Sequence, residues 1–449
     1  MNPVLIKRKF EEKEISRVKV AVADIDGVLR GKYISVGKFW SAVDHGLSFC
    51  DVVFGWDAGD VLYDNVKLTG WHTGYPDTPC QLDLTTVRLI PWEPNAAFFL
   101  LDPTDRKGQP LAVSPRQVLK RVLGQASERG YTAFLAAEYE FFLFRETPLS
   151  LHEKGFRRLT PLSPGMFGYS LLRAGQGMDF VVQVQEYLNG FDVPLESLHT
   201  ETGPGAFEAA ITVAEGMAAA DRAVLFKAVL KEIAARHGLT ATFMAKCNPE
   251  LPGSGGHIHQ SLWDGPKGHN LFHQEEGAGL SQLMGRYVAG LVVNLPELMA
   301  LLCPTINSYK RTVPGVWAPV NASWGIDNRT AAVRVIPSGP KSTRVETRLA
   351  GADANPYLAM AASLAAGLDG IERNLNPTEP AVNAYAATQA APLPRNLADA
   401  TKLFRASAVA RRWFGDDFVD HFAATREWEV RQFEKAVTDW ELARYLETI

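Results

Sequence analysis

The sequence predicts an α+β protein in which a small, mostly β N-terminal unit precedes a larger unit of mixed helices and strands. Strand and helix signals are interspersed along 449 residues without the strict alternation that a parallel α/β sheet requires. A turn cluster at residues 102–110, rich in Asp, Pro and Gly, marks a boundary after the first hundred residues. The composition, 46% hydrophobic and 21% charged, is that of an ordinary soluble globular protein.

Hydrophobic patterns and cap residues place the elements along the chain. Strands are predicted at residues 18–28, 82–89, 97–101, 133–144, 257–263, 334–336 and 343–349. Helices are predicted, between capping residues and glycine stops, at residues 114–130, 218–237, 281–302, 355–370 and 416–446. Residues 54–71 and 145–177 are rich in glycine and turn-forming residues, and we expect both to be loops.

Charge and cysteine content exclude several classes of protein. The net charge of −4 gives no electrostatic attraction to nucleic acid or to an anionic membrane, so neither is expected as a partner. The N-terminal segment lacks the apolar core of a signal peptide, and no uncharged apolar run reaches membrane-spanning length. The four scattered cysteines form no Cys-x-x-Cys pair, which favours reduced thiols in a cytoplasmic protein.

Three short stretches place ionisable residues two apart. Glu138 and Glu140 form one pair, His257 and His259 form another, and the segment 344–348 alternates Arg, Glu and Arg. Side chains two apart on a strand point to the same face of a sheet. Brought together, these groups would repel one another unless a ligand such as a metal ion or a phosphate bound among them.

Further carboxylates fit the same site. Glu201 and Glu208 flank a glycine-rich turn that lets the chain fold back, so both could reach one ligand. A lone glutamate is usually a solvated surface group, but Glu138 lies in an otherwise apolar strand. Oxygen-rich sites with an imidazole and no thiolate favour Mg²⁺ or Mn²⁺ over Zn²⁺.

A basic cluster lies between residues 311 and 348. Its members are Arg311, Arg329, Arg334, Lys341, Arg344 and Arg348. Such cations could form a solvated face, but several lie in segments that resemble sheet, and arginine suits carboxylate and phosphoryl oxygens. Carboxylate-held metals beside arginines indicate phosphoryl transfer, in which catalysis depends on positioning and charge neutralisation.

In these motifs, in this order, the chain resembles the glutamine synthetase family, in its bacterial type I branch, over nearly its whole length. The matching segments are 137–142, 201–208, 253–262, 307–311, 328–329, 341–348 and 355–357. The resemblance implies an N-terminal β-grasp domain at 13–108 and a catalytic domain at 109–449, with a curved antiparallel sheet flanked by helices. It also implies a homo-oligomer, commonly a dodecamer of two hexameric rings, with active sites between subunits.

The resemblance implies a reaction and a set of site residues. ATP would phosphorylate the side-chain carboxylate of L-glutamate, and an amine would displace the phosphate. The metal ligands, for two or more ions per site, would be Glu140, Glu201 and Glu208 for one ion and Glu138, His257 and Glu346 for another. ATP would bind Glu196, His259, Ser261, Arg334, Lys341 and Arg344. Glutamate would bind Glu140, Gly253, His257, Arg311 and Arg348. Arg329 would stabilise the transferring phosphoryl group, and Glu201 would take part in catalysis.

Two departures from the family pattern concern the amine. The family carries a flap glutamate in the segment that corresponds to residues 311–319, and here Trp317 stands in its place. The N-terminal segment that supplies an aspartate is altered too; Asp57 is the candidate for that catalytic role, and Trp56 adds an aromatic face. Aromatic surface in place of an acid suits an amine with a carbon substituent better than ammonium. We therefore expect a γ-glutamyl amide ligase acting in amine catabolism on an alkyl, aryl or hydroxyalkyl monoamine or a polyamine.

Three alternatives stay open at this point. Trp317 could be a packing residue in a true glutamine synthetase that uses ammonium. A catalytically silent structural relative and a guanidino kinase are more remote, because the charged positions of the family are kept and the resemblance implies a β-grasp domain before them. Tyr385 falls where regulated members carry a modified tyrosine, but the residues after it are not acidic, so we expect no such modification.

Overall fold

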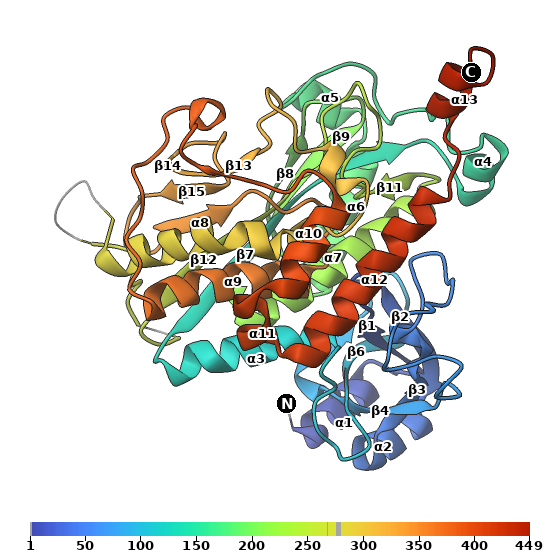
Figure 1. Cartoon of the computed structure of the whole chain (residues 1–449). Helices are drawn as coiled ribbons and strands as arrows, with labels where there is room; N and C mark the ends of the chain where they lie inside the picture. The colour runs from blue at the N-terminus through green and yellow to red at the C-terminus, as the bar shows by residue number, and fades with distance from the viewer. Residues whose placement is uncertain (1, 267, 275–279) are drawn as a thin grey trace.

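The computed structural model describes residues 2–266, 268–274 and 280–449, and it contains two main sheets, each with its own helices (Figure 1). The larger sheet carries most of the predicted site residues. The chain is therefore α+β, as the interspersed signals predict.

The N-terminal unit, which runs from α1 to β6, is built on a six-stranded sheet in the order β2-β1-β6-β4-β3, with β5 paired to β6. Its elements are α1 (Pro3–Glu12), β1 (Arg17–Ala23), β2 (Leu29–Ser35), α2 (Val36–His45), β3 (Leu47–Cys50), β4 (Asp77–Leu82), β5 (Arg88–Leu89) and β6 (Ala96–Pro103). Strand β1 is antiparallel to β2 and parallel to β6. Ile6 and Phe10 of α1 and Phe39 of α2 pack into its core, so the unit holds two helices that the sequence patterns did not predict.

The second sheet has nine strands in the order β14-β15-β16-β12-β7-β9-β8, and β10 and β11 pair with β7. The strands are β7 (Thr132–Phe144), β8 (Leu195–Thr200), β9 (Ala206–Ile211), β10 (Ala214–Glu215), β11 (Thr240–Thr242), β12 (Gly256–Trp263), β14 (Trp324–Ile326), β15 (Val333–Ile336) and β16 (Arg344–Thr347). Its pairings are antiparallel except for the short parallel pair β14–β15. A separate two-stranded ladder joins β13 (Asn321–Ala322) to β17 (Ala391–Pro392).

Helices cover the second sheet and bury its apolar face (Figure 1). The helices of the second unit are α3 (Pro115–Glu128), α4 (Pro148–Glu153), α5 (Leu171–Gly175), α6 (Met178–Gly190), α7 (Gly216–Arg236), α8 (Gln282–Leu302), α9 (Pro356–Glu372), α10 (Leu397–Ala406), α11 (Ala408–Phe414), α12 (Asp416–Glu434) and α13 (Asp439–Tyr445). Of these, α4, α5 and α13 contain no buried residue. Helix α8 is apolar and long enough to cross a membrane, but most of it is buried in the protein. It packs on α9 so closely that a Cβ on Gly290 would lie 2.3 Å from the Ala366 carbonyl oxygen.

A buried ionic network joins the two units. Arg116 of α3 contacts Asp83 at 2.8 Å and Asp102 at 2.6 Å in the N-terminal unit, and Asp221 of α7 at 2.9 Å. Three carboxylates compensate one buried guanidinium, which is the condition under which such a charge is tolerated. Tyr357 donates to Asp221 at 2.7 Å and extends the network to α9.

Three sequence predictions need correction. Residues 82–89 are not one strand, because Asp83 accepts a hydrogen bond from the Thr85 amide and turns the chain into a short 3-10 helix. The predicted loop 145–177 contains α4 and α5. The predicted helix 416–446 is two helices, since Thr438 caps a second one, α13, which stands away from the body at the upper right of Figure 1.

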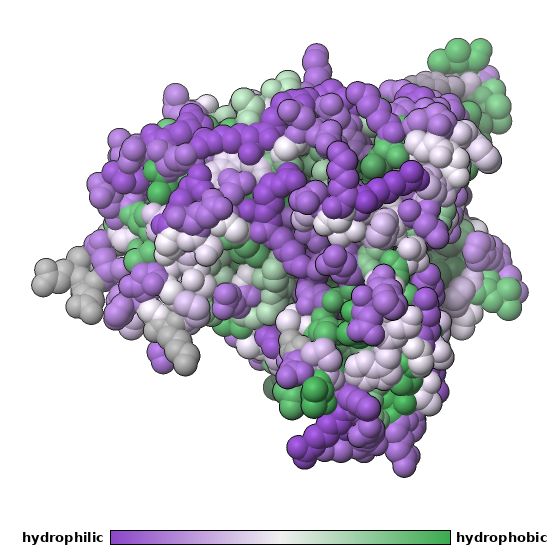
Figure 2. All heavy atoms as spheres, turned by 90° about the horizontal axis from the view of Figure 1, so that it is seen from below, coloured by the Kyte–Doolittle hydropathy of each residue, from purple (hydrophilic) through white to green (hydrophobic). Residues whose placement is uncertain are grey.

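The exposed face turned toward the viewer in Figure 2 is mainly hydrophilic, with hydrophobic residues in separate small patches. The site lies elsewhere, on the sheet of the second unit.

Candidate active site

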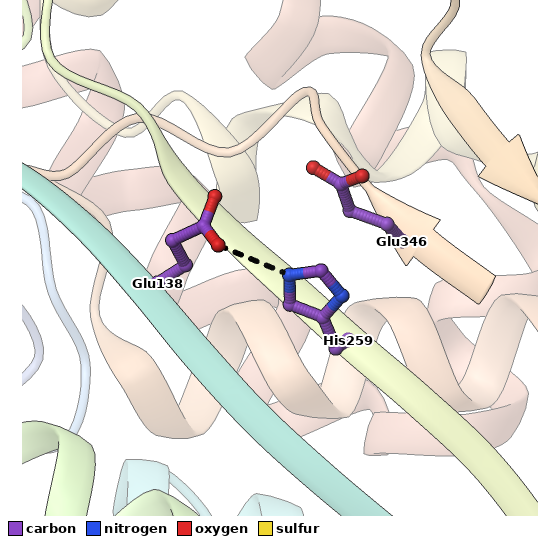
Figure 3. A group of neighbouring side chains, drawn as sticks. All are labelled: Glu138, His259 and Glu346. Carbon is purple, nitrogen blue, oxygen red and sulfur yellow. Dashed lines mark ion pairs between the residues drawn. The ribbon is translucent and has the colours of Figure 1, made fainter. Parts of the chain in front are cut away.

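Direct cross-strand pairing brings the ionisable residues of the central strands together. Glu138 of β7 lies opposite His257 of β12, and His259 lies opposite Glu346 of β16. The alternation of side chains along each strand puts these groups on one face. Figure 3 shows Glu138, His259 and Glu346 converging from three strands.

The same relation continues on the other side of β7. Glu140 lies opposite Glu208 of β9, and Glu208 lies opposite His199 of β8. Glu201 follows directly after the last residue of β8. The sheet register therefore gathers carboxylates and imidazoles from five adjacent strands, as the spacing of the motifs predicts.

A cavity of about 760 Å³, here called the large cavity, contains most of the predicted residues. The predicted residues in its wall are Glu138, Glu140, Glu201, Glu208, Gly253, His257, Arg311, Trp317, Arg329, Arg334 and Arg348. The cavity combines carboxylates on one side with arginines on the other. Such a lining suits a ligand or set of ligands that carries both cations and anions.

A second cavity of about 230 Å³, the small cavity, lies on the other side of Glu138. Its wall contains Glu196, His259, Ser261, Lys341 and Arg344, all residues for which the resemblance implies contact with ATP, and Glu138 as well. Arg334, assigned to the same group, lines the large cavity instead. Glu138 thus lies in the wall of both cavities.

The carboxylates and imidazoles form three overlapping groups whose ligand atoms lie within 4.8 Å of one another. The groups are Glu138 with His259 and Glu346, Glu138 with Glu208 and His257, and His199 with Glu201 and Glu208. Nδ1 of His257 lies 3.0 Å from Glu138 and 3.5 Å from Glu346, so His257 is close to both carboxylates. Glu140 instead accepts a hydrogen bond from the Gly255 amide at 2.7 Å.

The electrostatics of the carboxylates differ from one to the next. Burial and the negative charges of Glu138, Glu140 and Glu201 raise the pKa of Glu208 to about 9. Burial would also raise the pKa of Glu346, but the positive charges of Arg348 and the histidines lower it to about 2. The surrounding negative charge therefore favours the protonated, neutral form of Glu208.

This donor set fits a divalent cation of the hard type. The ligand atoms are carboxylate oxygens and imidazole nitrogens, which Mg²⁺ and Mn²⁺ accept in proteins. Nε2 of His199 is buried without a hydrogen-bond partner in the described part of the chain, and it lies 3.4 Å from Glu208. A cation at this position would relieve the repulsion that raises the pKa of Glu208.

Buried arginines line part of the large cavity. Arg311 donates to the carbonyl oxygens of Leu349 at 2.5 Å and Ala350 at 2.9 Å. Its Nε is buried with no hydrogen-bond partner among the described residues. A Cβ on Gly253 would lie 2.5 Å from Cγ of Arg311, so only glycine fits beside it. An anionic group of a ligand could therefore approach the Arg311 guanidinium closely.

The flap, residues 311–319, forms part of the same wall. Trp317 is 65% exposed, and its backbone has φ 56°. A bulky residue adopts this left-handed conformation at a cost of about 1–3 kcal/mol, which is typical of functional positions. The structure therefore presents the indole at the edge of the cavity where the family carries an acid.

Asp57 and Trp56 do not line the large cavity of their own chain. Asp57 accepts hydrogen bonds from the amides of Gly59 and Val61 and, at 3.0 Å, from Nε1 of Trp428 in α12. Trp56 stacks under the Arg30 guanidinium, 4.9 Å from it. Their role in amine binding therefore stays a prediction.

Two residues in the site were not predicted. His199 lies two positions before Glu201, so the period-two rule that found the other groups would have found it as well. Tyr169 lines the large cavity from the segment predicted as a loop, and its ring stacks on His199 at 4.4 Å. Like Trp317, it is largely exposed and has a left-handed backbone, with φ 55°.

Comparison with known proteins agrees with this geometry. Residues 112–445 match the model of the glutamine synthetase catalytic domain. A type-1 glutamine synthetase 2 of Dictyostelium discoideum is 48% identical over 96% of this chain and 84% of its own length. A glutamate–isopropylamine ligase of a Pseudomonas species is 41% identical over 99% of this chain and 98% of its own.

A solved structure of GmaS in complex with ADP superposes with a TM-score of 0.85 at 29% identity, covering 98% of both chains. These matches span the N-terminal unit as well as the catalytic sheet. The chain therefore belongs to the glutamine synthetase family.

Proposed function

We infer that this protein is an ATP-dependent glutamate–amine ligase. It joins the γ-carboxylate of L-glutamate to an amine and releases ADP and phosphate. The observation that carries the proposal is the pair of cavities that meet at Glu138, one lined by the residues expected to bind ATP and the other by those expected to bind glutamate. A phosphoryl group passing from one substrate to the other needs this adjacency, because transfer depends on in-line positioning.

Each side of the cavities has a task in this reaction. Lys341 and Arg344 offer cations to the nucleotide phosphates in the small cavity. Arg311 and Arg348 hold the carboxylate groups of glutamate in the large cavity. Arg329, which is exposed at the same wall, stabilises the charge of the transferring phosphoryl group.

The carboxylate and imidazole groups would hold Mg²⁺ or Mn²⁺, two or more ions per site. The ligands would be Glu138, Glu140, Glu201, Glu208, His257 and Glu346, with His199 and His259 close by. Divalent cations supply charge neutralisation of the phosphates in reactions of this class. Glu201, which lines the large cavity, would also take part in catalysis by accepting a proton from the incoming amine.

The choice of amine is supported by the aromatic wall of the large cavity. Tyr169 and Trp317 both expose their rings there, and no flap carboxylate faces them, since Trp317 occupies its place. An apolar face stabilises a carbon substituent by roughly 25 cal/mol per Å² buried, and ammonium has no carbon substituent to bury. A small alkyl, aryl or hydroxyalkyl amine is thus the favoured substrate class. The name of the Pseudomonas relative points the same way.

We also propose a cytoplasmic homo-oligomer, a dodecamer of two hexameric rings, in which a neighbouring subunit completes each site. All four cysteines are free thiols, which suits a reducing compartment. The loop with Trp56 and Asp57 is fixed to its own α12 by Asn65, which donates to the Ala424 carbonyl oxygen at 2.7 Å. A loop held this way can serve a cavity in the adjacent subunit.

Glutamine synthesis from ammonium is the second candidate, and the 48% identity to a type-1 glutamine synthetase 2 favours it. A panel of amines and ammonium, at equal concentration with ATP, glutamate and Mg²⁺ or Mn²⁺, separates the two. Products are identified by mass spectrometry, and released phosphate is measured. An amine with a higher kcat/KM than ammonium supports the ligase; ammonium as the best substrate overturns it. No phosphate release with any of them would identify a silent relative.

A further inference from the structure

Residues 381–392, here called the strap, touch two parts of the large cavity at once. The strap contains the short 3-10 helix Ala384–Ala386 and ends in β17. Strand β17 pairs with β13, which directly follows the flap. Nδ2 of Asn321 in β13 also donates to the Ala384 carbonyl oxygen at 2.7 Å. The strap is thus bound to the end of the flap by backbone and side-chain contacts.

Tyr385 makes the contact with the flap itself. Its half-buried hydroxyl donates to the Ala318 carbonyl oxygen at 3.2 Å. Burial raises the pKa of Tyr385, and backbone hydrogen bonds from Gly315 and Trp317 act against this shift. The hydroxyl oxygen therefore faces the amides of the flap as well as the Ala318 carbonyl. Among the described residues, Tyr385 is the residue whose side chain hydrogen-bonds to residues 314–319.

The strap also holds the turn that carries Arg329. Nδ2 of Asn328 donates to the carbonyl oxygens of Ala381 at 2.7 Å and Val382 at 3.0 Å. Oγ1 of Thr330 accepts from the Ala384 amide at 3.2 Å. The strap therefore fixes both Arg329, the residue proposed to contact the phosphoryl group, and Trp317, the residue proposed to contact the amine.

The tether matters for the middle of the flap, because Arg311 and Ala318 near its ends are buried and the middle is not. Residues 313–317 are exposed, and Trp317 keeps a left-handed backbone that a free loop would leave. A hydrogen bond from the half-buried Tyr385 can hold that conformation. A phenylalanine at this position lacks the hydroxyl and keeps the ring.

We propose that Tyr385 is a positioning residue that ties the flap to the strap and thereby fixes the Trp317 indole on the amine side of the cavity. This inference rests on the proposed function, because it assigns Trp317 to the amine. It gives Tyr385 a role in substrate selection rather than in covalent regulation, and a group attached to its hydroxyl would break the tether.

The test compares Tyr385→Phe with the wild-type holoenzyme. Loss of one hydrogen bond should raise the KM for the best amine about three- to tenfold and leave the KM for glutamate and for ATP within about twofold. Hydrogen–deuterium exchange should increase in peptides covering residues 312–320. The matched control is Tyr33→Phe, which removes a hydroxyl bonded to Glu93 at 2.9 Å in the N-terminal unit and should change neither quantity.

A double-mutant cycle asks whether Tyr385 acts through Trp317. Trp317→Ala should lower selectivity for the amine over ammonium, and adding Tyr385→Phe should change it little further. If the two substitutions lower selectivity independently, so that their effects multiply in the double variant, the proposal is overturned. It is also overturned if Tyr385→Phe leaves the KM for the amine unchanged, or raises the KM for amine, glutamate and ATP equally. Substrate identity is scored separately on the wild-type protein. If ammonium is its best substrate, the KM for ammonium replaces the KM for the amine in the test of Tyr385. The proposed function and the proposed role of Tyr385 can therefore fail independently of each other.

Discussion

Glu346 lies directly opposite Arg334 across the β15–β16 pair and accepts a hydrogen bond from its Nη1 at 3.0 Å. Glu346 is completely buried, and Arg348, just after the end of β16, also contacts it. The Glu346 carboxylate thus contacts two arginines of the large cavity and also His257 of β12. Its removal should affect both folding and catalysis.

Glu346→Ala should cost about 3–5 kcal/mol of unfolding free energy, because it leaves buried guanidinium charge uncompensated. Glu346→Gln keeps the shape and should cost less, but it should still abolish metal-dependent phosphate release. Thermal unfolding and phosphate release measure the two effects. The control Glu372→Gln breaks an exposed pair with Arg129 and should cost no more than about 1 kcal/mol. Full activity of Glu346→Gln would contradict the assigned metal role.

Cation binding should release protons from Glu208. The pKa of Glu208 is raised to about 9 by burial and by its acidic neighbours, so the metal-free carboxyl is protonated at pH 7. A bound Mn²⁺ requires the carboxylate, so close to one proton should leave per site at pH 7, and none above pH 10. Calorimetry in two buffers of different ionisation enthalpy measures this release. Glu208→Gln should not show it; equal release from both proteins would disprove the assignment.

The raised pKa of Glu208 also determines whether the stability of the folded protein rises or falls with pH. Between the usual carboxyl pKa of 4.5 and about 9, the folded metal-free protein binds more protons at Glu208 than the unfolded chain does. Its contribution to stability therefore falls as the pH rises through this range, and a bound cation should remove the fall.

Trp317→Glu should move substrate preference toward ammonium. The substitution removes an apolar face and places an acid where the family carries one, so the ratio of kcat/KM for amine over ammonium should fall by about tenfold or more. Trp317→Gln is the matched control, because it removes the indole without adding charge. It should lose amine activity without gaining ammonium activity. If both variants gain ammonium activity equally, the carboxylate is not the cause.

His421 should make the protein sensitive to acid. Burial lowers its pKa to about 4; the charge of Arg426 acts in the same direction, and a backbone contact with Phe54 acts against it. The unfolded chain therefore binds the proton first, so stability falls as the pH drops from 6.5 to 4, by about 3 kcal/mol. His421→Leu should flatten the pH dependence of thermal unfolding in this window, whereas the exposed His45→Leu should not. An unchanged slope in His421→Leu would rule this explanation out.

Much of the catalytic sheet could be predicted because its strands carry functional side chains at every second position. Strand β7 combines this alternation with a buried apolar face, so the spacing of Glu138 and Glu140 indicated both structure and site. His199 was missed although it follows the same rule, because β8 is mostly polar and partly exposed and offers no apolar pattern to identify it as a strand.

Other features depend on contacts distant in sequence. Nothing in the spacing of Asp57 indicates that Trp428, 371 residues later, occupies one of its oxygens. The tether from Tyr385 to Ala318 is likewise a product of the fold, since the two segments meet only after α9 has turned the chain back. The alternation of side chains within a strand can be recognised from neighbouring residues in the sequence. Contacts between residues far apart in the sequence can be recognised only in the folded structure.

The shared position of Glu138 has a thermodynamic consequence. Glu138 borders both cavities, so an occupant of either one contacts the same carboxylate and changes its interaction with an occupant of the other. The affinities of nucleotide and amino acid are then linked, and by reciprocity each must alter the other by the same factor. Ordered or synergistic loading would follow from a single carboxylate, with no large domain movement.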